Sequence, residues 1–228
     1  MSGRGRRRGF LRENSLTLTF LVMFLLALAG QALAGHRLYN EEQMEHHEHT
    51  VGFFDFLTSS RFAVEVTENW QSEFLQFALY VVATIWLVQR GSSESKPPGK
   101  EGGGGDEEER LGRHAGPDSP LWARVGGLRT AIYSNSLALL FAALFIGSWL
   151  AQALTGWRDY NADQKSHGEV VVSFPTYLHQ PDFWDRTLQN WQSEFLAVGA
   201  MAIFAVYLRQ RGSPESKAVG APHSETPE

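Results

Sequence analysis

The sequence predicts an all-α membrane protein with four transmembrane helices, made of two tandem two-helix repeats related by a pseudo-two-fold axis along the membrane normal. Three observations predict this class: apolar blocks, an internal repeat and an uneven spread of Lys and Arg. Residues 14–96 align without a gap with residues 135–217, at an offset of 121 residues. Of the 83 aligned positions, 35 are identical. A long internal repeat of this kind indicates that one structural unit is used twice.

Apolar residues are concentrated in four blocks, residues 16–33, 74–88, 137–154 and 195–208. With its flanks, each block approaches the roughly 20 residues that a helix needs to cross a hydrocarbon core of about 30 Å. The second and fourth blocks are short unless their entrances, at Trp70 and Trp191, are included. The chain of 228 residues has no cysteine, which excludes disulfides and thiolate chemistry.

The repeat and the basic residues together predict the topology. An even number of crossings in each unit returns the chain to its starting side, so the two units have the same orientation. Residues 1–14, 89–134 and 208–228 hold fifteen of the twenty Lys and Arg, and the two inter-helix loops hold five. Basic residues favour the cytoplasmic side, so we expect both termini to be cytoplasmic.

Composition divides the chain into five segments. The segment between the repeats is rich in Gly, Glu and Pro and cannot bury a core, so we expect it to be disordered. The expected segments are a basic cytoplasmic N-terminus (1–13), the first two-helix repeat (14–96), a Gly/Glu-rich cytoplasmic linker (97–120), a juxtamembrane segment with the second repeat (121–217), and a disordered tail (218–228).

A secretory signal is the alternative for the first apolar block. The basic stretch "RRGFLR" precedes an apolar run that ends in Ala32-Leu33-Ala34, which would place cleavage before Gly35. The run is longer than a typical signal core, and its counterpart at 137–154 lies in mid-chain, where no signal could act. We therefore expect the first helix to be retained.

Four segments, "FLRENSL", "GHRLYNEEQ", "NWQSEFLQ" and "QRGSSESK", resemble an uncharacterised family of bacterial integral membrane proteins that is defined only as a domain of unknown function. The resemblance covers nearly all of the chain outside the linker and tails. It implies a multi-pass protein of the bacterial plasma membrane, and it implies no activity.

The longest identity is the seven-residue motif "NWQSEFL" at 69–75 and 190–196, whose glutamates are Glu73 and Glu194. Of the twenty-five Asp and Glu residues, only these two adjoin the apolar blocks. An ionisable group beside hydrocarbon is costly unless it is paired, hydrated or protonated, so it indicates a site. The remaining members of this candidate polar site are Asn69, Asn190, Ser72, Ser193, Gln31, Gln152, Arg37 and Arg158.

Two interpretations of this site remain open. In the first, the glutamates form a structural polar belt in which Arg37 pairs with Glu73 and Arg158 with Glu194. In that case a Glu→Gln change should destabilise the protein. In the second, the two-fold axis brings both carboxylates together as a proton or cation site, and Gln is tolerated.

A weaker candidate is a metal site in the two inter-helix loops. Its ligands would be His46, Glu48, His167 and Glu169, a set that suits Zn²⁺ or a similar divalent ion. A solvated acidic loop that binds metal loosely is the simpler interpretation. We therefore predict no cofactor, with a divalent metal as the alternative.

The sequence contains no HExxH, Cys pair or Gly-rich phosphate loop. We therefore expect a non-enzymatic structural or envelope-associated membrane protein. Carriage of a proton or cation and extracytoplasmic metal binding are the two alternatives. The expected partners are the lipid bilayer and either a second copy of the chain or another membrane protein, and no nucleic acid.

Overall fold

The computed structural model describes residues 9–45 and 47–227, and throughout these residues the regular secondary structure is helical. The all-α prediction is therefore confirmed. Two described helices are apolar and long enough to cross a membrane, α2 (Ser15–Glu45) and α7 (Ser136–Ser166). This is two rather than the four expected. The helices of the other two apolar blocks, α4 (Ser60–Trp86) and α9 (Pro181–Tyr207), begin with polar and charged residues.

Short helices connect the long ones. They are α1 (Phe10–Glu13), α3 (Phe53–Leu57), the 3₁₀ helix η1 (Gly112–His114), α5 (Leu121–Arg124), α6 (Gly127–Ser134) and α8 (Phe174–Tyr177). The segment between α4 and α5, where we expect disorder, contains turns and η1, and its disorder stays a prediction. The chain divides into two compact units, residues 1–63 and 64–228, and the boundary in the sequence falls within α4.

Unit 1 has a small aromatic core at the end of α2. Phe56 of α3 is 1% exposed and lies against the rings of Tyr39 and Phe62. The Asn40 side chain holds the loop before α3, because its Oδ1 accepts from the Val51 amide at 2.8 Å and its Nδ2 donates to the Val51 carbonyl at 3.1 Å. One side chain thus satisfies both backbone polar groups of a loop residue.

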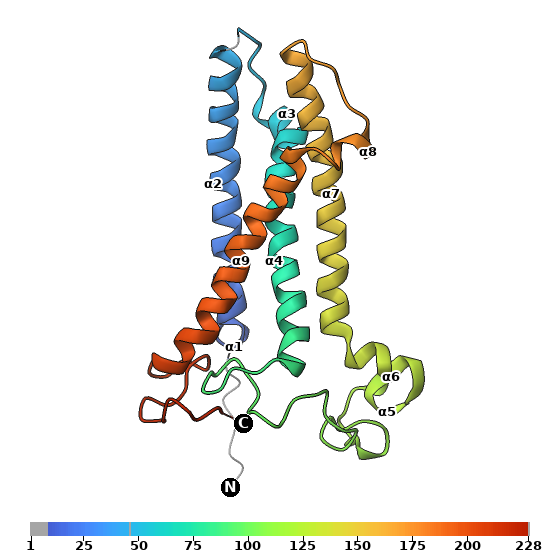
Figure 1. Ribbon diagram of the computed structural model, residues 1–228, viewed down its shortest axis with the longest axis vertical. Coiled ribbons are helices and arrows are strands. Elements are labelled where there is room, and N and C mark those ends of the chain that lie inside the picture. Colours follow the sequence, from blue (N-terminus) through green and yellow to red (C-terminus); the bar gives the residue numbers. More distant parts are fainter. Residues whose placement is uncertain (1–8, 46, 228) are drawn as a thin grey trace. The chain divides into compact units, whose positions relative to one another are not determined.

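Unit 2 repeats this arrangement with a larger core. Tyr177 of α8 and Phe183 of α9 are buried against Ala153 of α7. Asn161 holds the Val172 amide at 2.8 Å and the Val172 carbonyl at 2.9 Å, as Asn40 holds Val51 in unit 1. Figure 1 shows α8 beside the C-terminal part of α7 and α9 running obliquely to α4 and α7.

A glycine allows the close approach of α8 to α7 in unit 2. A Cβ on Gly156 would lie 2.5 Å from the Tyr177 hydroxyl and 3.2 Å from a Val64 methyl group. Real Cβ atoms essentially never show a contact as short as 2.5 Å, so any larger residue at position 156 would require the Tyr177 hydroxyl to shift. The small residue is required for packing and not for a turn.

The helix bounds in the two halves of the chain correspond. The offset of 121 residues carries the first and last residues of α2 onto those of α7, and those of α4 onto those of α9. Each helix of the first pair has 31 residues and each of the second has 27. This agreement supports the interpretation of the repeat as one structural unit used twice.

Candidate functional site

The candidate site is a row of polar side chains along α4 and their partners on α9, within unit 2. Glu68, Ser72, Gln76 and Tyr80 follow one another at intervals of four residues. Residues at this spacing lie on one face of a helix. We call this row, with its α9 partners, the α4–α9 seam.

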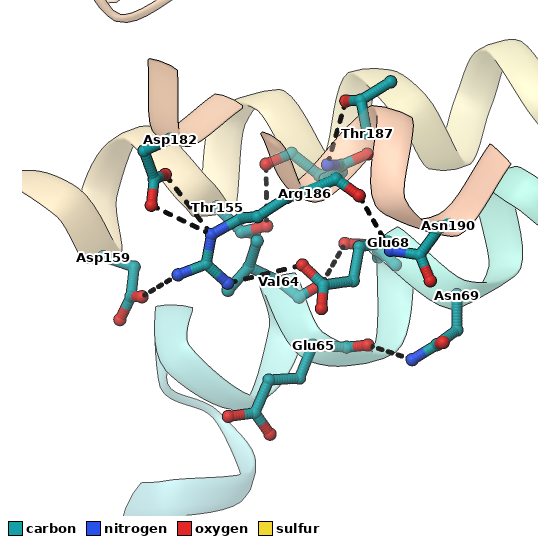
Figure 2. Close-up of polar contacts among 12 residues, drawn as sticks. Val64, Glu65, Glu68, Asn69, Thr155, Asp159, Asp182, Arg186, Thr187 and Asn190 are labelled. Atoms are coloured by element: carbon teal, nitrogen blue, oxygen red, sulfur yellow. Dashed lines mark hydrogen bonds and ion pairs between the residues drawn. The ribbon is translucent and has the colours of Figure 1, made fainter. Parts of the chain in front are cut away.

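The seam begins at a charged cluster around Arg186, shown in Figure 2. The guanidinium contacts Asp182 at 3.2 Å, Glu68 at 3.3 Å and Asp159 at 3.9 Å. These carboxylates come from α9, α4 and α7, so the cluster ties the three long helices of unit 2 together. The four side chains are 16–31% exposed, and three negative charges surround one positive charge.

The cluster also affects a group outside the long helices. Burial and the neighbouring Asp182 raise the pKa of the Tyr177 hydroxyl, which donates to Asp182 at 3.0 Å.

Two buried glutamines occupy the middle of the seam. Gln71 of α4 is fully buried, and its Oε1 accepts from the Trp191 indole at 2.9 Å. Gln152 of α7 is 1% exposed, and its Nε2 donates to the Thr187 hydroxyl at 3.3 Å. The other amide atoms, Nε2 of Gln71 and Oε1 of Gln152, are buried without a hydrogen-bond partner among the described residues. Such atoms are costly unless water or a ligand satisfies them.

The two copies of the seven-residue motif meet in the seam. The Ser72 hydroxyl donates to Glu194 Oε1 at 3.3 Å, and the Gln76 amide donates to the Glu194 carbonyl at 3.3 Å. Ser72 is 1% exposed and Glu194 is half-buried, whereas Glu73 is exposed. The duplicated motif therefore forms part of the contact between α4 and α9.

A cavity of about 290 Å³ continues the seam toward the C-terminal end of α4. Gln76 and Tyr80 line it together with Glu94 and Glu215, which occupy equivalent positions in the repeat. The Tyr80 hydroxyl donates to the Glu94 carboxylate. This end of the seam is thus open and carries two carboxyl groups.

The remaining residues of the predicted polar site take other positions. Asn69 and Asn190 each donate to the backbone carbonyl four residues earlier, and Ser193 donates to the Asn190 carbonyl. Arg158 is exposed, and no ion pair described in unit 2 joins it to Glu194. The described partner of the Glu194 carboxylate is the Ser72 hydroxyl.

Arg37 and Gln31 lie in unit 1, where Arg37 is exposed and Gln31 is half-buried. Pairing of Arg37 with Glu73 would join the two units and stays a prediction.

Three of the four predicted metal ligands lie among the described residues. His46 lies outside them, while Glu48, His167 and Glu169 are exposed. The ring of His167 bonds to the Asp163 carbonyl at 2.9 Å, which is a contact within its own helix end. Across residues 9–45 and 47–227 no group of three metal-binding side chains is found.

Sequence reasoning missed the Arg186 cluster because it considered residues that recur in both repeats. At the repeat offset Arg186 aligns with Glu65 and Asp182 with Arg61, so these charges are reversed between the copies. The usable signal was the spacing of four residues between Asp182 and Arg186 at the start of a helix, which favours an ion pair. Asp159, the partner on α7, could not be found in this way, because it lies on a different helix from Arg186.

The fold and site define an all-helical protein with two membrane-span candidates, α2 and α7, and an interhelical polar seam. The chain belongs to the DUF6766 family, a domain of unknown function whose family pattern matches residues 7–228. This confirms the resemblance noted from the sequence. No curated protein and no solved structure matches the chain.

Proposed function

We propose that the chain is a four-crossing integral membrane protein with a structural, non-enzymatic role. The observation that supports this is the α4–α9 seam. The polar residues that make α4 and α9 less apolar than α2 and α7 bond largely to one another, as Ser72 does to Glu194 and Gln71 to Trp191. A helix whose polar groups are satisfied by its neighbour can cross a bilayer despite them.

The outward faces of these helices are apolar. Leu140 and Leu150 of α7 are 57% and 54% exposed, and Leu196 and Ile203 of α9 are 69% and 53% exposed. Soluble proteins rarely expose so many large apolar side chains along the same helices. Contact with lipid accounts for this exposure, and this supports the proposal that α9, and by the repeat α4, cross the membrane as α7 and α2 do.

The role that fits this arrangement is mechanical. The Arg186 cluster ties α4, α7 and α9 at one end, and the duplicated motif joins α4 to α9. Together with the family resemblance, this supports a component of the bacterial plasma membrane that presents two aromatic-rich loops outside the cell. Metal binding in those loops remains the alternative.

The absence of cysteine from the chain allows a direct test of the topology. Single cysteines are placed at the exposed positions Thr50, Val170, Glu107 and Ser224. We expect a membrane-impermeant maleimide to label positions 50 and 170 in intact cells, and positions 107 and 224 only after permeabilisation. The reverse pattern, or labelling of all four in intact cells, would contradict the proposal.

The first helix should be retained in the mature protein. α2 runs without a break from Ser15 to Glu45, past the signal-type boundary at Ala34. We expect intact-mass spectrometry of the purified protein to include residues 15–34. A mature chain that begins at Gly35 would show that α2 is a cleaved signal and would reduce the crossings to three.

A further inference from the structure

We propose that the α4–α9 seam conducts protons across the membrane, with Glu194 as the protonatable group at its centre. This rests on the proposed four-crossing topology and adds an activity to it. The row from Glu68 to Tyr80 extends over twelve residue steps, which is about 18 Å of helix at 1.5 Å per residue. It covers much of the hydrocarbon thickness that a proton must cross.

The buried glutamines leave two polar atoms without a partner in the first half of the path. The indole of Trp191 requires an acceptor, so it fixes Gln71 with Oε1 toward α9 and leaves Nε2 without a partner. Gln152 Oε1 is unpartnered in the same region, since Thr187 and Trp191 lie one turn apart on α9. A free donor and a free acceptor at two almost fully buried amides suit bridging water molecules.

The cavity provides the second half of the path. Its volume of about 290 Å³ holds several water molecules at roughly 30 Å³ each. Gln76 lies at the junction, because it bonds to the Glu194 backbone and also lines the cavity with Tyr80, Glu94 and Glu215. Water in the cavity therefore reaches from the neighbourhood of Glu194 to two carboxyl groups at its end.

The chemistry at Glu194 is a proton exchange without other bond changes. Water held at the glutamines delivers a proton to the Glu194 carboxylate, which then donates a hydrogen bond to the Ser72 hydroxyl where it previously accepted one. The proton leaves to water in the cavity and then to Glu94 or Glu215. The other ionisable groups near the path are Glu73, beside Glu194, and the Glu68–Asp159–Asp182–Arg186 cluster at its start.

A proton fits this site better than a metal cation. Divalent cations such as Ca²⁺ and Mg²⁺ require six or more oxygen ligands in a shell. The described contacts of the Glu194 side chain are one hydroxyl, and the amide of Gln76 points its N–H groups at the backbone oxygen. One carboxylate with a hydroxyl partner can hold a proton but forms no cation cage.

The test uses the full-length protein in phosphatidylcholine–phosphatidylglycerol liposomes that contain a pH-sensitive dye. A potassium gradient with valinomycin drives proton entry. We expect protein-dependent acidification that Glu194→Gln reduces about tenfold and that Gln76→Leu also reduces by closing the junction. Asp185→Asn, an exposed acidic residue of the same helix that lies outside the seam, is the matched control and should conduct like the wild type.

Thermal unfolding in detergent checks that each variant is folded, and Gln76→Leu serves if Glu194→Gln is unstable. Flux equal to that of empty liposomes, or an undiminished flux in folded Glu194→Gln, would overturn the proposal. Flux of Na⁺ without protons would do the same and would identify a cation path. Because cysteine labelling tests the topology independently, failure of the proton path is distinguishable from failure of the proposed fold in the membrane.

Discussion

Replacement of Arg186 by Met is expected to reduce the free energy of unfolding by about 3 kcal/mol, the lower end of the range for breaking a buried ion pair. The change leaves Glu68, Asp159 and Asp182 close together with no cation between them. Their side chains are 16–31% exposed, so solvent screens part of the repulsion. Denaturant titration in detergent, followed by tryptophan fluorescence, measures the loss.

The loss should depend on pH. Without Arg186, the carboxylates of Glu68, Asp159 and Asp182 repel one another while they are ionised. Protonation in acid removes this repulsion, so the loss of stability becomes smaller as the pH falls. We expect the deficit to be largest at neutral pH and smaller in acid. Arg158→Met, at an exposed position of α7, is the control, and an equal loss there would show that the cluster has no special role.

The second large effect is expected at the core of unit 2. Tyr177 is 1% exposed and packs against Tyr160 and Phe183. Tyr177→Ala should lower the free energy of unfolding by about 3–5 kcal/mol, since removal of a buried aromatic ring leaves a cavity that the surroundings fill only in part. The same denaturant titration measures the change.

Two further variants distinguish the contribution of the Tyr177 ring to stability from that of its hydroxyl. Tyr177→Phe keeps the packing and removes the hydrogen bond to Asp182, so it should cost only about 1–2 kcal/mol. Val170→Ala, at a side chain that is 83% exposed, should change stability by less than about 0.5 kcal/mol. If Tyr177→Ala were no worse than Val170→Ala, the aromatic cluster would not be the core that holds α8 on α7.

The local sequence was sufficient to predict the helices. The apolar blocks predict α2 and α7 because a long uninterrupted apolar run has few alternatives to a helix. The offset of 121 residues predicts that the helices recur, and the bounds of α4 and α9 correspond in the same way. Asn161, inside a repeated motif, also has the counterpart Asn40 with the same contacts. These features depend on residues close in sequence, or on copies of them.

The contacts between helices were decided by tertiary structure. The sequence pointed to Glu73 and Glu194 as equivalent, yet one is exposed and the other bonds to Ser72 of the opposite copy. Spacing could suggest Arg158 as the partner of Glu194, but the arginine that forms the central network is Arg186. Sequence alone determined an all-helical chain built from a repeated unit, because helix formation and apolar patterning are local. Only the packing of α4, α7 and α9 decided which polar groups meet, because the rotation of one helix against another depends on side chains far apart in the sequence, 35 residues for Gln152 and Thr187 and 118 residues for Glu68 and Arg186.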